Sequence, residues 1–121
     1  MEIAETSKVE RKEIVSVTIL GTPYKIIFET EKENPKLKGL DGYCDWTTQI
    51  ISINKSILDD GYLDCVGNLD FEVKKIVRHE IAHAFFMESG MTKYAEDEVL
   101  VEWIASQFQK INTAFLKVET C

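Results

Sequence analysis

Residues 71–89 read FEVKKIVRHEIAHAFFMES, and this stretch decides how the rest of the chain is interpreted. Its apolar residues take a helical period, which differs from the alternation seen earlier in the chain. Gly90 follows as a residue that readily ends a helix. Asn68 or Asp70 can cap the N-terminus, where the helix dipole favours Glu72. The stretch therefore predicts a helix of about five turns that ends at Gly90.

The centre of this helix carries the motif H-E-x-x-H, as residues 79–83. Positions four apart lie on one helix face, roughly 6 Å apart, so the rings of His79 and His83 can reach a common point. Two imidazole nitrogens at about 2.0–2.1 Å from one zinc ion fit that reach. Glu80 lies at the edge of the same face, where it can take a proton from a zinc-bound water. The motif predicts His79 and His83 as zinc ligands and Glu80 as the general base.

Two observations favour a metal site over a pair of packed histidines. His79 and His83 are the only histidines in the chain, and their neighbours in the helix are apolar. Histidines on a solvated helix face would be expected among polar residues. Without a metal, the two rings would have to be hydrogen-bonded inside the core.

A catalytic zinc site needs three protein ligands and a water, so the third ligand must be a carboxylate, a thiolate or a tyrosine. A second helix is predicted over residues 95–116, where apolar residues again recur at helical spacing. Its start is acidic. Glu98 and Glu102 are four residues apart and share a face, whereas Glu96 and Asp97 are expected to be solvated. A solvated acidic face is the alternative explanation for Glu98 and Glu102 as well.

The residues before the H-E-x-x-H helix predict a small sheet. Stretches 13–20, 24–30 and 49–54 are rich in β-branched residues and are expected as strands, the first two as a hairpin. Residues 43–48 are expected to lead into the third strand. Strands followed by two helices predict an α+β domain with a small, mostly antiparallel sheet. The H-E-x-x-H motif resembles that of the zincin peptidases, in which the edge strand beside the metal pairs with a bound peptide, and this resemblance implies residues 49–54 as the best candidate for that strand.

Length and charge limit the classes of function. The chain has 121 residues, with 14 Lys and Arg against 21 Asp and Glu, a formal net charge of −7. This length predicts a single domain over residues 1–121, with residues 1–12 as a flexible or short helical arm. The acidic balance argues against nucleic acid and anionic membranes as partners, because their phosphates would be repelled. Neither a membrane span nor a signal peptide is recognised, so a cytoplasmic location is expected.

The three cysteines do not form a recognisable site in the sequence. Cys44, Cys65 and Cys121 are widely spaced and form no C-x-x-C pair. Such a set predicts reduced thiols rather than a disulfide framework. For Cys44 a structural role is expected ahead of a role as a regulatory metal ligand.

The two helical stretches resemble those of the gluzincin metallopeptidases. In that group the H-E-x-x-H helix is followed by a helix with E-x-x-x-D, whose Glu is the third zinc ligand and whose Asp accepts a hydrogen bond from the first histidine. Residues 98–102 of this chain read EVLVE. The resemblance implies Glu98 as the third ligand. It also implies Glu102, in place of the Asp, as the residue that orients His79, or as the alternative ligand.

The sequences RHEIAHAFFMESGM and AEDEVLVEWIASQF are also similar to the corresponding helices of short zincins of the ImmA/IrrE type, some of them encoded by phages. This resemblance implies a minimal zincin-like domain that binds one Zn²⁺ per chain and hydrolyses a peptide or protein substrate in the cytoplasm of a bacterium or phage-infected host. Arg78 and Tyr94 are candidates for stabilising a transition-state oxyanion. The alternative function is a zinc-stabilised, non-catalytic interaction module, such as a phage accessory protein, whose folding depends on the metal.

Overall fold

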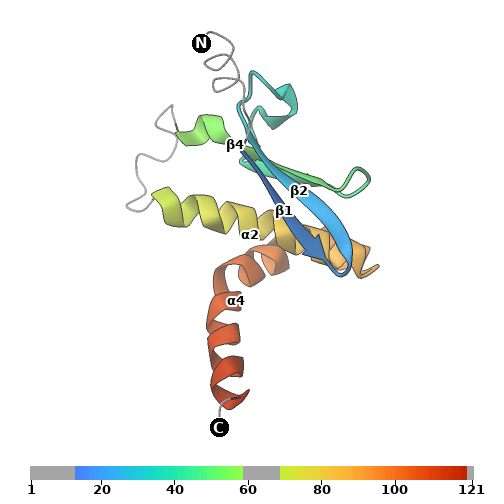
Figure 1. The fold of residues 1–121 in the computed structure, drawn as a ribbon, viewed down its shortest axis with the longest axis vertical. Coiled ribbons are helices and arrows are strands. Elements are labelled where there is room, and N and C mark those ends of the chain that lie inside the picture. Colours follow the sequence, from blue (N-terminus) through green and yellow to red (C-terminus); the bar gives the residue numbers. More distant parts are fainter. Residues whose placement is uncertain (1–12, 59–68, 120–121) are drawn as a thin grey trace, which may run out of the picture.

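The computed structural model describes residues 13–58 and 69–119, in which four strands are followed by two long helices. Figure 1 shows their arrangement. These elements are β1 (Glu13–Ile19), β2 (Thr22–Glu29), β3 (Gly42–Asp45), β4 (Ile50–Asn54), α2 (Leu69–Glu88) and α4 (Glu98–Glu119). Three short helices connect them: η1 (Pro35–Leu37), η2 (Lys55–Leu58) and α3 (Thr92–Ala95). The predicted α+β class is confirmed. The arm predicted for residues 1–12, the thiols of Cys65 and Cys121, and the predicted helix cap Asn68 lie outside the described residues. The alternative cap, Asp70, lies inside α2, which begins at Leu69.

The sheet is mixed, with the strand order β1-β2-β4-β3. β1 pairs antiparallel with β2 through the predicted hairpin, and β3 pairs antiparallel with β4. The central pair, β2 and β4, is parallel. The expectation of a mostly antiparallel sheet therefore needs correction at its centre. After β2 the chain passes through η1 and forms β3 at the edge of the sheet opposite β1. β4 then lies between β2 and β3 and runs parallel to β2.

Strand β3 is the edge strand beside α2, and β4 is an interior strand. Residues 43–48 were expected only to lead into a strand, but residues 42–45 form β3 themselves. The prediction that residues 49–54 form the edge strand is wrong. Within β4, Ile51 and Ile53 are buried together with their polar neighbours Ser52 and Asn54. Burial on both faces is typical of a central strand.

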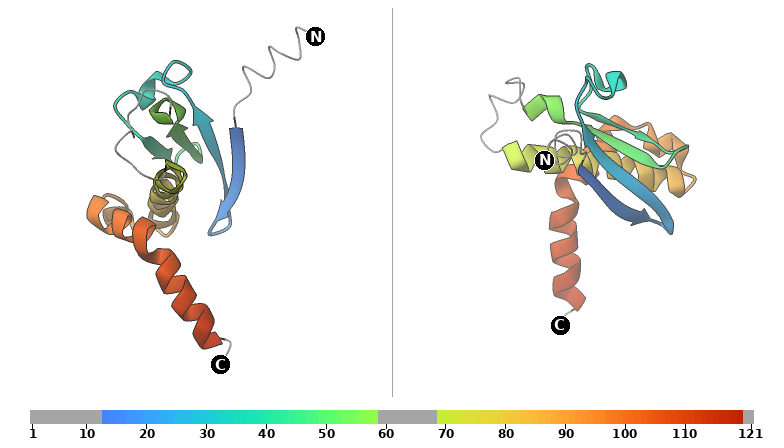
Figure 2. Two further views of the ribbon diagram at one scale, coloured as in Figure 1. Left: turned by 90° about the vertical axis from the view of Figure 1, so that its left-hand side faces the viewer. Right: turned by 45° about the horizontal axis from the view of Figure 1, so that its top comes forward.

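Helix α2 lies between the sheet and α4. One side of α2 packs on the sheet, where the core consists of Ile19, Tyr24, Ile26, Ile51, Ile53, Ile76 and Ala84. On its other side, α2 contacts the first turns of α4, in which Val101 and Ala105 are buried. Figure 2 shows α4 leaving this contact and projecting away from the rest of the molecule. Among the described residues, no helix has both the length and the apolar character that a membrane crossing requires.

The helix predicted over residues 95–116 corresponds to α4, and only Ala95 of that range belongs to the short helix α3. Gly90 ends α2 with a φ of +76°, a left-handed conformation that glycine adopts readily. α3 follows, and α4 begins at Glu98, three residues later than residues 95–116 predicted. Asp97 caps α4, because its Oδ1 accepts a hydrogen bond of 3.1 Å from the backbone N–H of Leu100.

Asn54 holds the loop that leads to β3. Its side chain is 2% exposed, and its Nδ2 donates to the backbone carbonyls of Leu37, at 3.3 Å, and Leu40, at 2.9 Å. The backbone N–H of Asn54 donates to the carbonyl of Asp41 at 2.8 Å. These bonds fix the chain just before Gly42. They thereby position the start of β3 opposite the H-E-x-x-H segment of α2.

Candidate metal centre

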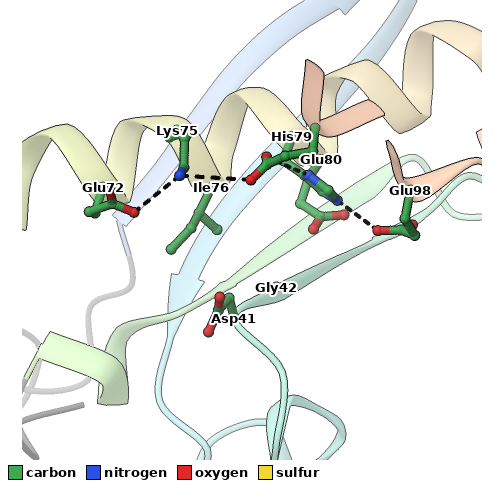
Figure 3. Close-up of a pocket in the computed structure, with 9 residues that line it drawn as sticks. Asp41, Gly42, Glu72, Lys75, Ile76, His79, Glu80 and Glu98 are labelled. Atoms are coloured by element: carbon green, nitrogen blue, oxygen red, sulfur yellow. Dashed lines mark hydrogen bonds and ion pairs between the residues drawn. The ribbon is translucent and has the colours of Figure 1, made fainter. Parts of the chain in front are cut away.

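A pocket of about 350 Å³ lies between α2, the start of α4 and the start of β3. Its lining residues are Asp41, Gly42, Glu72, Lys75, Ile76, His79, Glu80, Glu98 and Glu102. Figure 3 shows Asp41 and Gly42 across the pocket from the residues of α2, with Glu98 at one end. The helix face predicted to bind a metal therefore borders this pocket.

Three potential ligand atoms converge at one end of the pocket. The Nε2 atoms of His79 and His83 are 3.2 Å apart. One carboxylate oxygen of Glu98 is 3.1 Å from Nε2 of His79, and the other is 2.9 Å from Nε2 of His83. The structure thus brings together the two histidines of α2 and the first residue of α4, the three residues that were expected to form the site.

The imidazole rings of His79 and His83 are each oriented by a hydrogen bond at Nδ1, the nitrogen that faces away from the cluster. Nδ1–H of His83 donates to the backbone carbonyl of Ala95 at 2.6 Å, and Nδ1–H of His79 donates to Glu102 Oε1 at 3.2 Å. The carbonyl of Ala95 only accepts, so a neutral His83 ring has its proton on Nδ1 and an acceptor lone pair on Nε2. His79 has a carboxylate at each ring nitrogen, Glu102 at Nδ1 and Glu98 at Nε2. A cation between the two Nε2 atoms and Glu98 would be held by rings whose other nitrogens already have hydrogen-bond partners.

The separations fit a zinc ion. Three atoms bound at about 2.0–2.1 Å with tetrahedral angles lie roughly 3.3 Å from one another. The two Nε2 atoms are 3.2 Å apart, and each is 2.9 to 3.1 Å from a different oxygen of Glu98. One ligand atom from each of the three residues lies within 4.8 Å of the others, a spacing that allows a shared ion. The donor set of two imidazoles and one carboxylate also suits zinc and leaves a coordination position open.

Glu80 lies in the wall of the pocket and is 7% exposed. Its burial raises its pKa to about 7. His79 acts in the opposite direction, whereas the charges of Glu98 and Asp41 raise the pKa further. A carboxyl group with a pKa near neutrality can both accept and return a proton at physiological pH.

Gly42 allows the close approach of β3 to Glu80. A Cβ atom at this position would lie 2.8 Å from the carbonyl oxygen of Ser52 and 3.5 Å from Cγ of Glu80. The first of these distances is a clash with backbone. Because glycine has no Cβ, the start of β3 can pack directly against the strand beside it and against the glutamate of the motif.

Other candidates from the sequence lie away from the pocket. Nε–H of Arg78 donates to the backbone carbonyl of Ala105 at 2.9 Å and so connects α2 with α4. Tyr94 lies on α3, where its ring contacts that of Phe86 on α2, and it does not line the pocket. Burial raises the pKa of the Cys44 thiol to about 12, with further increases from nearby carboxylates including Glu80. Cys44 packs against the core as a neutral thiol, which agrees with its expected structural role.

Five of the described residues that line the pocket were not identified as site residues from the sequence: Asp41, Gly42, Glu72, Lys75 and Ile76. For Lys75 a signal was available, because it precedes His79 by four residues and therefore shares its helix face. Glu72 precedes His79 by seven residues, about two helical turns, so the sequence also places Glu72 on this helix face. Asp41 and Gly42 reach the pocket only through the crossing of the chain after β2. No local pattern in their surroundings indicates that position.

Comparison with known proteins gives no family for this chain. No protein family, no curated protein and no solved structure matches it. The likeness of α2 and α4 to the helices of short zincins is therefore a resemblance of motifs only. A function for the chain has to be inferred from the residues of the site.

Proposed function

We propose that the chain is a zinc-dependent peptidase with a minimal zincin-like fold, in which His79, His83 and Glu98 bind the metal and Glu80 is the general base. The observation that carries this proposal is the meeting of two features in one pocket. Two imidazole rings, each with a hydrogen bond at Nδ1, meet the Glu98 carboxylate at its end, and a buried carboxyl group with a pKa near 7 lies in its wall. Glu102 is the residue that orients His79.

The division of roles follows from the positions of the side chains. Bound zinc would supply a Lewis acid that acidifies water and polarises a carbonyl group. Glu80 follows His79 directly in the chain, yet its carboxyl group is buried in the pocket wall and outside the cluster of ligand atoms. From there it accepts the proton of the attacking water and returns it to the leaving amine.

Strand β3 supports a peptide as the substrate. Within the described residues, β3 pairs with β4 on one side, and its other side forms the edge of the sheet. Gly42 at its start lines the pocket. An extended peptide that adds to this edge by backbone hydrogen bonds would pass beside the ligand cluster. This is the role that the sequence analysis assigned to residues 49–54.

A second candidate function is a zinc-stabilised interaction module without catalysis. It is favoured by the second half of α4, where Phe108, Phe115 and Val118 are at least half exposed. Such a surface is typical of proteins that bind a partner. Glu80 separates the two functions, since a purely structural zinc site has no use for a buried carboxyl group beside it.

The test compares the wild-type chain with Glu80→Gln and with the control Glu96→Gln, which makes the same change at an exposed acidic residue outside the pocket. Native mass spectrometry measures bound zinc, and a mixture of unstructured peptides measures hydrolysis. We expect one zinc in all three proteins, with hydrolysis reduced about 100-fold or more in Glu80→Gln alone. Full activity of Glu80→Gln would contradict the mechanism. Zinc binding without hydrolysis by the wild type would favour the interaction module.

A further inference from the structure

A row of alternating charges leads into the ligand cluster. Nζ of Lys75 is 3.5 Å from Oε2 of Glu72 and 3.7 Å from Oε2 of Glu102. The other oxygen of Glu102 accepts the hydrogen bond from Nδ1 of His79 at 3.2 Å. Figure 3 shows this row from Glu72 through Lys75 to His79 and on to Glu98. One cation thus contacts the carboxylate that orients a proposed metal ligand.

The two helices bring the row together. Glu72, Lys75 and His79 are spaced by three and four residues, so they lie along one face of α2. Glu102 lies one turn after Glu98 on α4 and faces them from the second helix. The side chain of Lys75 is 26% exposed and that of Glu102 is 48% exposed. In this arrangement Lys75 joins the two helices at the level of the site.

We infer that Lys75 is a positioning residue for the metal site. It holds Glu102 in the orientation in which its second oxygen receives the proton of His79 Nδ1, and Glu72 in turn holds Lys75 in place. The inference rests on the metal binding part of the proposed function and not on hydrolysis.

The direction in which zinc affinity changes when Lys75 is removed distinguishes a positioning role from a purely electrostatic one. Among the described residues that line the pocket, Lys75 is the one lysine or arginine. A positive charge near the site repels a divalent cation, so charge alone predicts that removing it tightens zinc binding. Removing a residue that holds Glu102 and His79 in place predicts the opposite, weaker binding. The two explanations therefore cannot both fit one measurement.

The contacts of Lys75 argue against a direct role in binding a substrate carboxylate. Its ammonium group already contacts two carboxylates, Glu72 and Glu102. A third carboxylate would have to displace one of them. The pocket also contains Asp41, Glu80 and Glu98, so it is acidic overall and would repel an anionic group.

The experiment measures the affinity for Zn²⁺ alone, by competition with a chelating dye. The variants are Lys75→Met, Lys75→Arg and the control Lys74→Met, which removes a lysine at an exposed neighbouring position outside the pocket. We expect Lys75→Met to weaken binding by about threefold to tenfold, less than the 10-fold to 100-fold typical of a residue that contacts a metal ligand directly. Lys75→Arg and Lys74→Met should stay within about twofold of the wild type.

A double-mutant cycle with Glu102→Ala gives the decisive comparison. If Lys75 acts through Glu102, Lys75→Met will cause no weakening in the Glu102→Ala background. Unchanged or tighter binding in Lys75→Met alone would overturn the inference, as would an equal weakening in both backgrounds. A wild type that binds zinc without hydrolysing peptides contradicts the proposed peptidase but leaves this cycle decisive. A wild type that binds no zinc overturns both.

Discussion

The pocket face of α2 and the second half of α4 differ in which side chains they cover. The pocket face covers polar side chains, whereas the second half of α4 exposes apolar ones. At the pocket, Glu80 is buried and His79 is largely covered, although both are polar. Along residues 106–119 of α4, which we call the stem, Phe115 and Val118 are 59% and 72% exposed. Figures 1 and 2 show the stem projecting away from the sheet and α2. A hydrophobic period therefore indicates which face of a helix is apolar, but the topology decides whether anything covers it.

The first turns of α4 show where the difference begins. Val101 and Ala105 are 0% and 3% exposed, and Arg78 of α2 donates to the carbonyl of Ala105. These contacts bring Glu98 and Glu102 to the pocket. The apolar period continues beyond Ala105 without a described partner. Changes at the covered positions in the first half of α4 should consequently affect stability, changes at Glu98 and Glu102 should affect metal binding, and changes in the stem should affect neither.

The largest effect is expected for Glu98→Ala. This change removes a proposed ligand at the first residue of α4, so zinc affinity should fall by more than about 100-fold, beyond the typical cost of losing a residue outside the ligand set. The matched control is Glu96→Ala, which alters an exposed glutamate two residues earlier and should leave the affinity unchanged. Competition with a chelating dye measures all variants.

Glu102→Ala decides between the two candidate third ligands. As the residue that orients His79, Glu102 should contribute about 10-fold to 100-fold in zinc affinity. If Glu102→Ala loses the metal and Glu98→Ala retains it, the assignment of the third ligand is reversed.

A pH dependence is expected for the metal-free protein. Burial raises the pKa of Glu80 to about 7 from an ordinary value of 4.5, so between these values the folded state holds a proton that the unfolded chain has released. The stability that this difference provides is present at low pH and is lost as the pH rises toward 7. Relative to Glu80→Gln, the wild type should lose roughly 2 kcal/mol of unfolding free energy between pH 5 and pH 7.

Denaturant unfolding with a chelator, at both pH values, measures this difference. Between pH 5 and pH 7 the ionisation of Glu88 does not contribute, because hydrogen bonds from Tyr24 and Thr22 lower the pKa of Glu88. Glu88 acts in the opposite direction, because its contribution is lost only as the pH falls below its ordinary pKa of 4.5. Parallel pH profiles for the wild type and Glu80→Gln would show that Glu80 ionises normally in the folded state.

Local patterns in the sequence predicted most elements of the fold. The hairpin of β1 and β2, the strand β4 and the end of α2 at Gly90 follow from alternation, helical period and a glycine stop, and the structure confirms them. The parallel pairing of β2 with β4 was not predicted, because it depends on where the chain goes between them. For the same reason the edge strand was assigned to residues 49–54 in place of β3.

The site shows the same division between local and non-local information. His79, Glu80 and His83 lie within five residues, so helical geometry alone places them on one face. Glu98 and Glu102 were selected through a resemblance, and the structure brings both next to His79. The roles of all five residues stay predictions until metal binding is measured. Gly42 lies at the pocket because Asn54 holds the loop before it, and the position of this loop depends on the whole fold.

A pair of identical substitutions tests the boundary of the covered surface. Val101 is fully buried against α2, whereas Val99, two residues earlier, is 82% exposed. Val101→Ala should lower the free energy of unfolding by about 1.5 kcal/mol, from the loss of two buried carbon groups. Val99→Ala should change it by less than about 0.5 kcal/mol. Equal effects would show that Val101 is not packed as described.

The smallest effect is expected for Phe115→Ala in the stem. The ring is 59% exposed, and alanine has the higher helix propensity, so the free energy of unfolding should stay within about 0.5 kcal/mol of the wild type and zinc affinity should not change. Denaturant unfolding at two protein concentrations provides the measurement. A loss above about 1 kcal/mol that grows with concentration would contradict an uncovered stem, because only burial of this ring between copies of the chain makes stability depend on both the ring and the concentration.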